Sequence, residues 1–366
     1  MFMWNLILTI IGIIGFIAVI YVARRIHRFS FIKRFGEKHG FLAWVISFLA
    51  VAAVVGLLAL INLYAVVIVL LHLLFAFLLC DLVGFIVRKA SKRRFGYDFQ
   101  NIAALLLAAV ILGTGWFLAH HVFETDYTFY TDKAVGNGLR IAEIADAHLG
   151  LTLDGEDFAE QMERVQQTQP DVVVLVGDFV DDDTEKQDML TACQALGKLE
   201  TTYGVYFVFG NHDNGYFNYR SFTAAELRDA LEDNGVTILE DESVLLNDSF
   251  YFVGRRDRSS PGRASAGDLT KGLDSSKYIV VLDHQPNDYA NEAASGADLV
   301  LSGHTHGGHI FPAGLIGLAT GANDRTYGTE ARGGTTFVVT SGISGWGIPF
   351  KTGTISEYVV IDVRSE

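Results

Sequence analysis

Residues 297–310, ADLVLSGHTHGGHI, join a short apolar run to three histidines and three glycines. The apolar run predicts a buried strand that ends where the histidines begin. Histidine is sparse elsewhere, because the whole chain of 366 residues holds only 11. A strand that ends in clustered imidazoles and glycines predicts a ligand site at the edge of a sheet.

Seven further apolar runs in the second part of the chain predict strands of the same kind. Helical patterns at 156–168 and 186–200 separate the early ones, and this alternation predicts a layered α/β domain. The seven runs lie at 139–146, 171–178, 204–211, 249–255, 277–284, 335–342 and 357–363.

Chemically active residues follow five of these eight strands, in the motifs DAH, GDFVD, GNHD, a single histidine and GHTH. Five of the six histidines after residue 125 fall in these motifs, and the sixth, His309, comes three residues after the last. The carboxyl ends of strands in an α/β sheet face one cleft, so we expect the motifs to meet there. The residues concerned are Asp146, His148, Asp178, Asn211, His212, Asp213, His284, His304 and His306.

This set offers carboxylate, amide and imidazole ligands without a thiolate, which suits manganese, iron or zinc. It is too large for one tetrahedral zinc, which takes three or four ligands. Two divalent cations that share one carboxylate fit the set. Such a pair lowers the pKa of a shared water and holds phosphoryl oxygens, so the sequence predicts a two-metal hydrolytic centre, with manganese the metal expected in vitro.

Charge and hydropathy divide the chain into two regions. Residues 1–125 hold 11 of the 28 basic residues but only 4 of the 42 acidic ones, a net charge of +7. The remaining residues carry a net charge of −21. Half of the chain is hydrophobic, and the apolar residues concentrate in the first region. We therefore predict a membrane region at 1–125 and a catalytic domain at 126–366.

The first region contains enough apolar sequence for several membrane spans of about 20 residues each. The apolar stretch 41–87 is long enough for two of them, and INLY at 61–64 predicts the turn between them. We expect a bundle of four transmembrane helices, with spans at 4–22, 41–61, 64–87 and 102–123.

Two basic loops indicate how these spans are oriented. Residues 23–40 and 88–101 concentrate lysine and arginine, and such loops stay in the cytoplasm. Two predicted spans separate the loops, so both can lie on that side. We therefore expect a multi-pass protein of the cell membrane whose catalytic domain is extracytoplasmic.

The five motifs, in this order, resemble those of the calcineurin-like metallophosphoesterases. The resemblance covers about residues 135–366, and SGISGWGIPF at 341–350 and the preceding spans are similar to the bacterial membrane-anchored branch. It implies a four-layer α/β/β/α sandwich, in which helices flank two mixed sheets. It also implies a metal-dependent phosphoric ester hydrolase in which a metal-bound hydroxide attacks phosphorus.

The resemblance implies two metal sites that share Asp178. Of these, the first would also use Asp146, His148 and His306, and the second Asn211, His284 and His304. His212 would contact the phosphate and protonate or orient the leaving group, and Asp213 is predicted beside it as a catalytic group. Asp213 and Asp181 would also orient the ligands.

Arg256 and His309 are the candidate substrate contacts outside the metal set. Arg256 lies in GRRDRSSPGR at 254–263, and guanidinium groups bind phosphate oxygens in pairs. The alternative is a solvated loop whose arginines pair with nearby acids. For His309 the alternative is a surface or packing role.

The expected substrate is a phosphate ester of a lipid or cell-envelope intermediate, because the membrane spans hold the cleft near lipid headgroups. A phosphodiester is placed first, and a monoester and a pyrophosphate stay open. Two alternatives stay open. One is a hydrolase of the UDP-2,3-diacylglucosamine pyrophosphatase type in lipid A synthesis, and the other is an inactive membrane scaffold that keeps the fold. The acidic domain argues against nucleic acid as a partner, and no obligate protein partner is indicated.

Overall fold

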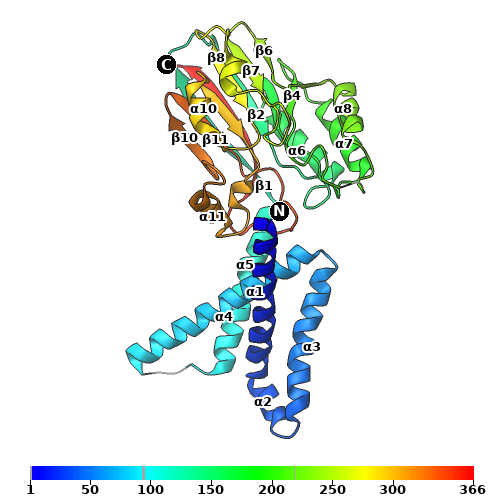
Figure 1. The fold of residues 1–366 in the computed structure, drawn as a ribbon, viewed down its shortest axis with the longest axis vertical. Coiled ribbons are helices and arrows are strands. Elements are labelled where there is room, and N and C mark those ends of the chain that lie inside the picture. Colours follow the sequence, from blue (N-terminus) through cyan, green and yellow to red (C-terminus); the bar gives the residue numbers. More distant parts are fainter. Residues whose placement is uncertain (1, 93–94, 218) are drawn as a thin grey trace. The chain divides into compact units, whose positions relative to one another are not determined.

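The chain forms two compact units, Met1–Gly115 and Trp116–Glu366 (Figure 1). The computed structural model describes the whole chain except residues 1, 93–94 and 218, and it describes no side chains for 1–11. The boundary between the units falls earlier than the predicted one between residues 125 and 126. The first unit is helical, and the second contains the sheets.

Helices form at each of the four predicted spans, and a short helix follows the first of them. They are α1 (Phe2–His27), α2 (Ser30–Gly36), α3 (Gly40–Ala59), α4 (Leu63–Ser91) and α5 (Tyr97–His120). Among the described residues, three helices (α3, α4 and α5) are long and apolar enough to cross a membrane. Three of the four predicted spans thus have a membrane-crossing helix in the described part of the chain, and the fourth, 4–22, falls partly on residues whose side chains are not described.

The predicted turn at INLY separates α3 from α4. Asn62 stands before α4, and its side-chain oxygen accepts a hydrogen bond from the backbone N–H of Ala65 at 2.8 Å. This cap satisfies one of the free amides at the start of the helix. Small buried side chains such as Ala18, Ala76 and Ala104 line the contacts between helices and allow their backbones to approach closely.

Two six-stranded mixed sheets form the second unit. The first sheet has the order β1 (Val122–Thr131), β12 (Ser356–Ser365), β2 (Leu139–Ile144), β3 (Val172–Val176), β4 (Val205–Val208) and β5 (Val236–Ile238). The second has the order β10 (Gly328–Arg332), β11 (Thr335–Val339), β9 (Leu299–Ser302), β8 (Tyr278–Leu282), β7 (Phe250–Gly254) and β6 (Glu242–Leu246).

Alternating side chains of the strands build three buried layers. In β3, Val172 and Val174 pack between the two sheets, whereas Val173 and Leu175 face the helices. The helices on that outer face are α6 (Gly155–Gln167), α7 (Lys186–Leu196) and α8 (Ala224–Asp233). The second sheet is covered by α9 (Ala266–Thr270) and α10 (Tyr289–Ala294). This is the predicted α/β/β/α sandwich.

The eight predicted strands all form, but β1, β5, β6 and β10 were not expected. The edge strand β1 pairs in parallel with all of β12, and its exposed and half-buried residues alternate. Its sequence, VFETDYTFYT, therefore lacks the continuous apolar run that marks a strand buried on both faces. The predicted span 102–123 reached into this strand, whereas α5 ends at His120.

Candidate metal centre

The five motifs follow five neighbouring strand ends, two of them in the second sheet and three in the first. The motif residues come after β2, β3 and β4 in one sheet and after β8 and β9 in the other. Contact between the sheets is close here, because a Cβ added to Gly303 would lie 2.6 Å from Ala145 Cβ and 2.7 Å from Asp146 Oδ2. The backbone N–H of His304 also donates to the Asp146 carboxylate at 2.9 Å. The predicted convergence is thus what the fold produces.

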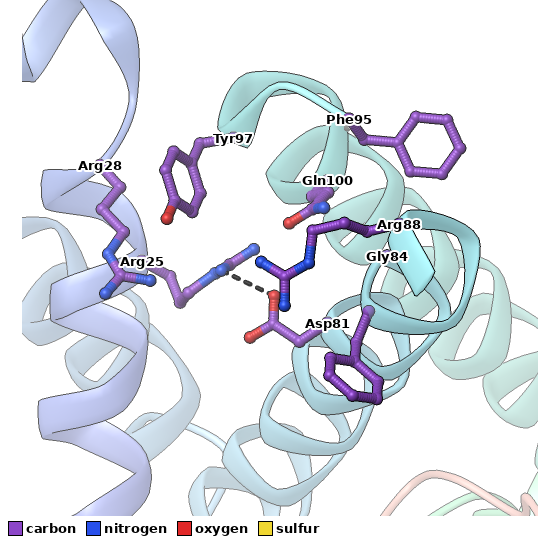
Figure 2. Close-up of a pocket in the computed structure, with 9 residues that line it drawn as sticks. Arg25, Arg28, Asp81, Gly84, Arg88, Phe95, Tyr97 and Gln100 are labelled. Carbon is purple, nitrogen blue, oxygen red and sulfur yellow. Dashed lines mark ion pairs between the residues drawn. The ribbon is translucent and has the colours of Figure 1, made fainter. Parts of the chain in front are cut away.

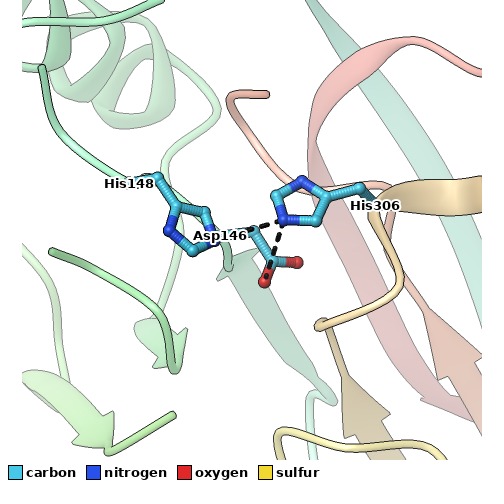
Figure 3. Close-up of side chains that lie close together, drawn as sticks. All are labelled: Asp146, His148 and His306. Carbon is cyan, nitrogen blue, oxygen red and sulfur yellow. Dashed lines mark hydrogen bonds and ion pairs between the residues drawn. The ribbon is translucent and has the colours of Figure 1, made fainter. Parts of the chain in front are cut away.

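A first group of potential ligands consists of Asp146, His148 and His306 (Figure 3), all of them buried. One ligand atom from each lies within 4.8 Å of the others. His306 Nε2 is 3.2 Å from His148 Nε2 and 3.9 Å from Asp146 Oδ1. The Nδ1–H of His306 donates to the carbonyl of Ser344 at 3.2 Å, which leaves the Nε2 lone pair directed at the group.

A second group consists of Asp178, His284 and His304, again with ligand atoms within 4.8 Å of one another. The Nδ1–H of His284 donates to the carbonyl of Val176 at 2.8 Å, and its Nε2 lies 3.0 Å from Asp178 Oδ2. The same Asp178 oxygen is 3.6 Å from His148 Nε2 of the first group. Asp178 therefore lies between the two groups, where a shared carboxylate is needed.

The donors fit divalent transition metals. Imidazole nitrogens whose second nitrogen is held by a backbone carbonyl, together with buried carboxylates, are the usual ligands and supports of such ions. Burial raises the pKa of Asp146 to about 6, whereas the facing histidines outweigh burial and lower the pKa of Asp178. Burial lowers the pKa of His304 to about 4, so this ring is a neutral donor at pH 7.

Backbone strain marks the same residues. A positive φ is uncommon outside glycine, and in side-chain-bearing residues it is associated with functional sites. Six non-glycine residues of the motif region adopt it, with φ in degrees as follows: Asp146 (55), His148 (36), Asp178 (53), His304 (71), His306 (47) and His309 (43). The loop after each of these strands turns sharply, and the turns bring the ligand side chains together.

His212 and Asp181 lie beside the first group. The His212 Nδ1–H donates to Asp181 Oδ1 at 3.0 Å, and Asp181 Oδ2 is 3.4 Å from His148 Nδ1. Asp181 therefore fixes two imidazoles at once, which agrees with the predicted orienting role. Burial opposes protonation of His212, but the bond to Asp181 and the charge of Asp178 outweigh it and raise the pKa of His212.

Asp213 organises the loops and does not face the reaction space. Its fully buried carboxylate accepts hydrogen bonds from the backbone N–H groups of Asp178, Phe179, Val180 and Gly210 at 2.7–3.1 Å. These four bonds occupy both oxygens. The prediction of Asp213 as a catalytic group is corrected here, and only its orienting role agrees with the structure.

Asn211 stands at the edge of the second group. Its Oδ1 accepts a hydrogen bond from the side chain of Gln285, the residue after His284, at 3.4 Å. Its Nδ2 donates to the hydroxyl of Tyr216 at 2.9 Å. The amide oxygen is thus bonded to the residue after His284, and Asn211 as a metal ligand stays a prediction.

The two predicted substrate contacts are engaged with protein groups. The side chain of Arg256 lies against Asp241, with Nε 3.7 Å from Oδ2, so the alternative of a paired arginine describes this loop. Its neighbour Arg255 is buried and pairs with Asp283 at 2.9 Å and Asp288 at 2.7 Å. His309 stacks on His306 with ring centroids 5.3 Å apart, which is the packing role.

Sequence reasoning missed two buried ionisable groups near the centre. Lys351 is fully buried, and its Nζ donates to the carbonyls of Ser341 and Gly342 at 2.7 and 3.1 Å; burial lowers its pKa to about 7. Glu143 on β2 is also fully buried, and burial and the charge of Glu357 raise its pKa well above the usual value. Neither has a motif around it, although GIPFKTGT places a lysine in an otherwise uncharged segment.

An α/β/β/α sandwich with paired Asp–His groups at its strand ends defines a metallohydrolase. A family model described as calcineurin-like phosphoesterase matches residues 139–308. An uncharacterized metallophosphoesterase from Aquifex aeolicus is 30% identical over 271 residues, which cover 71% of this chain and 99% of that protein. The chain belongs to the calcineurin-like metallophosphoesterases and is a metal-dependent phosphoric ester hydrolase.

Two proteins from Danio rerio are also similar to this chain. A transmembrane protein with metallophosphoesterase domain is 30% identical over 285 residues, 72% of this chain and 63% of its own length. The crystal structure of a dimetal phosphatase is 12% identical and matches 57% of this chain and 88% of its own, with a TM-score of 0.38.

The protonation state of buried Glu143 can be tested through the pH dependence of stability. The native state keeps its proton while the unfolded state releases it near the ordinary value of 4.5, so native stability declines as pH rises above that value. Glu143→Gln lacks this loss. Its advantage in unfolding free energy over the parent is expected to grow between about pH 5 and pH 8, by up to about 1.4 kcal/mol per pH unit.

Thermal unfolding of the full chain in detergent at both pH values measures this difference. Glu156→Gln, at an exposed position of α6, is the matched control and should follow the parent. A constant difference between Glu143→Gln and the parent across this range would contradict a neutral Glu143.

Proposed function

We propose that this chain hydrolyses a phosphodiester of a lipid or cell-envelope intermediate with two divalent cations, of which manganese is the expected metal in vitro. The observation that carries the proposal is the position of Asp178 Oδ2, 3.6 Å from His148 and 3.0 Å from His284. One cation would be held by Asp146, His148, His306 and Asp178. The other would be held by Asp178, Asn211, His284 and His304.

The bound pair would supply a water of lowered pKa and two positive charges beside the phosphoryl oxygens. The chain itself orients the groups around that chemistry. Carbonyl oxygens of Val176 and Ser344 fix the tautomers of His284 and His306, and Asp181 lies 3.4 Å from His148 Nδ1. No covalent bond between enzyme and phosphorus is required.

His212 is suited to deliver the proton to the leaving oxygen. It lies outside both ligand groups, its Nδ1–H is bonded to Asp181, and its ring centroid is 4.9 Å from that of His148. With Nδ1 held in this way, Nε2 carries the exchangeable proton. The raised pKa of His212 keeps part of the population protonated near neutral pH.

Asp178→Asn tests the shared carboxylate. The amide removes the negative charge between the two groups, so bound manganese and phosphodiesterase activity are both expected to fall, the latter at least about 100-fold. Elemental analysis and a chromogenic phosphodiester assay of the full chain in detergent measure the two quantities. Asp183→Asn, an exposed position in the same loop, is the matched control.

Retention of metal and activity in Asp178→Asn would overturn the proposed centre. Folded parent protein that takes up no transition metal and hydrolyses nothing would instead favour the scaffold alternative.

His212→Gln tests the proton donor. An alkyl leaving group needs protonation and a nitrophenolate does not, so the variant is expected to lose about 100-fold in kcat on an alkyl ester and much less on a nitrophenyl ester. Metal content, measured in the same samples, should equal that of the parent. Equal losses on the two esters would remove His212 from the proton transfer.

An apolar surface beside the centre supports a lipid substrate. α11 (Ala313–Thr320) has no buried residue in the structure, and Leu315 and Ile316 are 60% and 56% exposed. A groove of about 570 Å³ extends from Gly307 and Gly308 of the GHTHGG segment to Leu315 and Leu318. An acyl chain in this groove would bring its phosphate to the strand ends.

Leu315→Ser combined with Leu318→Ser tests this groove. Loss of apolar contact is expected to raise KM for a phospholipid substrate in mixed micelles by about tenfold, and to leave hydrolysis of a small chromogenic diester unchanged. Val110→Ser, an exposed apolar position in α5, is the control for general loss of apolar surface. Equal effects on both substrates would contradict lipid binding in the groove.

The two basic loops support an extracytoplasmic location of the catalytic unit in a multi-pass membrane protein. This orientation disfavours the UDP-2,3-diacylglucosamine alternative, which needs a cytoplasmic nucleotide. The net charge of −21 on residues 126–366 argues against nucleic acid as a substrate.

A further inference from the structure

A polar cavity of about 330 Å³ lies within the helical unit, far along the sequence from the metal-centre motifs (Figure 2). The end of α1, the second half of α4 and the start of α5 form its walls. Three arginines line it, Arg25, Arg28 and Arg88, together with one carboxylate, Asp81. The cavity is therefore strongly cationic in an apolar surrounding.

Arg25 is buried and only partly paired. It is 1% exposed, and its Nη1 lies 2.8 Å from Asp81 Oδ1. Its Nε and Nη2 have no hydrogen-bond partner among the described residues. Burial without full pairing is costly for a guanidinium group, so a further anion at these nitrogens would stabilise it.

Asp81 has little capacity left for the other two arginines. Its Oδ2 accepts a hydrogen bond from the hydroxyl of Tyr21 at 2.5 Å, while Oδ1 pairs with Arg25. Within the described part of the chain, neither Arg28 nor Arg88 has a carboxylate within 4 Å. The cavity thus holds three guanidinium groups against one carboxylate.

Aromatic rings hold these guanidinium groups at the cavity. The carbon of the Arg28 guanidinium lies 5.2 Å from the ring centroid of Tyr97, and that of Arg88 lies 5.5 Å from the ring of Phe85. Figure 2 shows the Arg25 and Arg88 groups on either side of the Asp81 carboxylate. Such contacts reduce the freedom of the side chains and leave their N–H groups available.

We propose that this cavity binds the phosphate group of an anionic phospholipid. Guanidinium forks pair with phosphate oxygens, and the cavity lies where α1 ends and α5 begins, at the ends of apolar helices. Arg25 and Arg28 lie in the basic stretch 23–40, and Arg88 lies in the basic stretch 88–101. Basic pockets between membrane helices at the cytoplasmic side recognise such headgroups.

The site is separate from the metal centre. Its residues all belong to Met1–Gly115, whereas the ligand groups belong to Trp116–Glu366. The lipid would be a bound partner of the helical unit and not the substrate.

The test is a titration of the purified full chain in neutral detergent with phosphatidylglycerol, followed by native mass spectrometry. The variant Arg28→Gln with Arg88→Gln removes two exposed cations of the cavity. Arg24→Gln with Lys89→Gln removes two exposed cations from the same helices, at positions that do not line the cavity. The matched pair separates a site from general attraction of a basic surface.

The parent is expected to retain phosphatidylglycerol in preference to phosphatidylcholine. The cavity variant should bind it at least about tenfold more weakly, and the control variant within about twofold of the parent. Equal losses in the two variants, or no preference for the anionic lipid, would overturn the site. Asp178→Asn should bind the lipid as the parent does, so failure of the metal centre and failure of this site are distinguishable.

Inorganic phosphate distinguishes the source of the anion. If millimolar phosphate displaces the lipid from the parent, the cavity is an anion site for which free phosphate competes. If it does not, the acyl chains contribute to binding and the lipid is the ligand. Both results support the site, provided that the cavity variant loses binding.

Discussion

The Asp178 carboxylate is the interaction on which the catalytic unit depends. One oxygen lies between His148 and His284, and the other accepts the backbone N–H of His212 at 2.8 Å. Its neighbours come from both sheets, so the carboxylate can bridge two ligand groups only if the strand ends of both sheets meet. The four-layer sandwich places these strand ends next to one another.

Holding these groups at one place has a structural cost that the surrounding loops offset. Five of the seven candidate ligands adopt positive φ, and Gly177 leaves no room for a side chain, since an added Cβ would lie 2.6 Å from His284 Nδ1. Asp213 binds four backbone amides and fixes two of the loops. Lys351 does the same for a third through carbonyl oxygens. Buried charges therefore act here as backbone anchors.

The sequence predicts the elements of this structure whose apolar residues follow a simple pattern. Strands buried on both faces appear as apolar runs, and the ordered motifs at their ends predict the Asp and His groups that the fold brings together. The edge strand β1 was not predicted, because its exposed and half-buried residues alternate and form no apolar run. Arg256 illustrates a different limit, because a sequence shows four arginines in one loop but not which acid each of them will reach. Lys351 and Glu143 are buried in a way that no local pattern indicates.

The charge distribution of the two units bears on what each can bind. Residues 1–125 carry +7 and expose arginines without carboxylate partners, whereas residues 126–366 carry −21. A field of negative sign concentrates divalent cations at the strand ends and repels substrates in proportion to their charge. A phosphodiester bears one negative charge, and a phosphomonoester near neutral pH bears up to two. The proposed diester would therefore meet less long-range repulsion from the acidic unit than a monoester, and the proposed anionic lipid would be attracted to the basic helical unit.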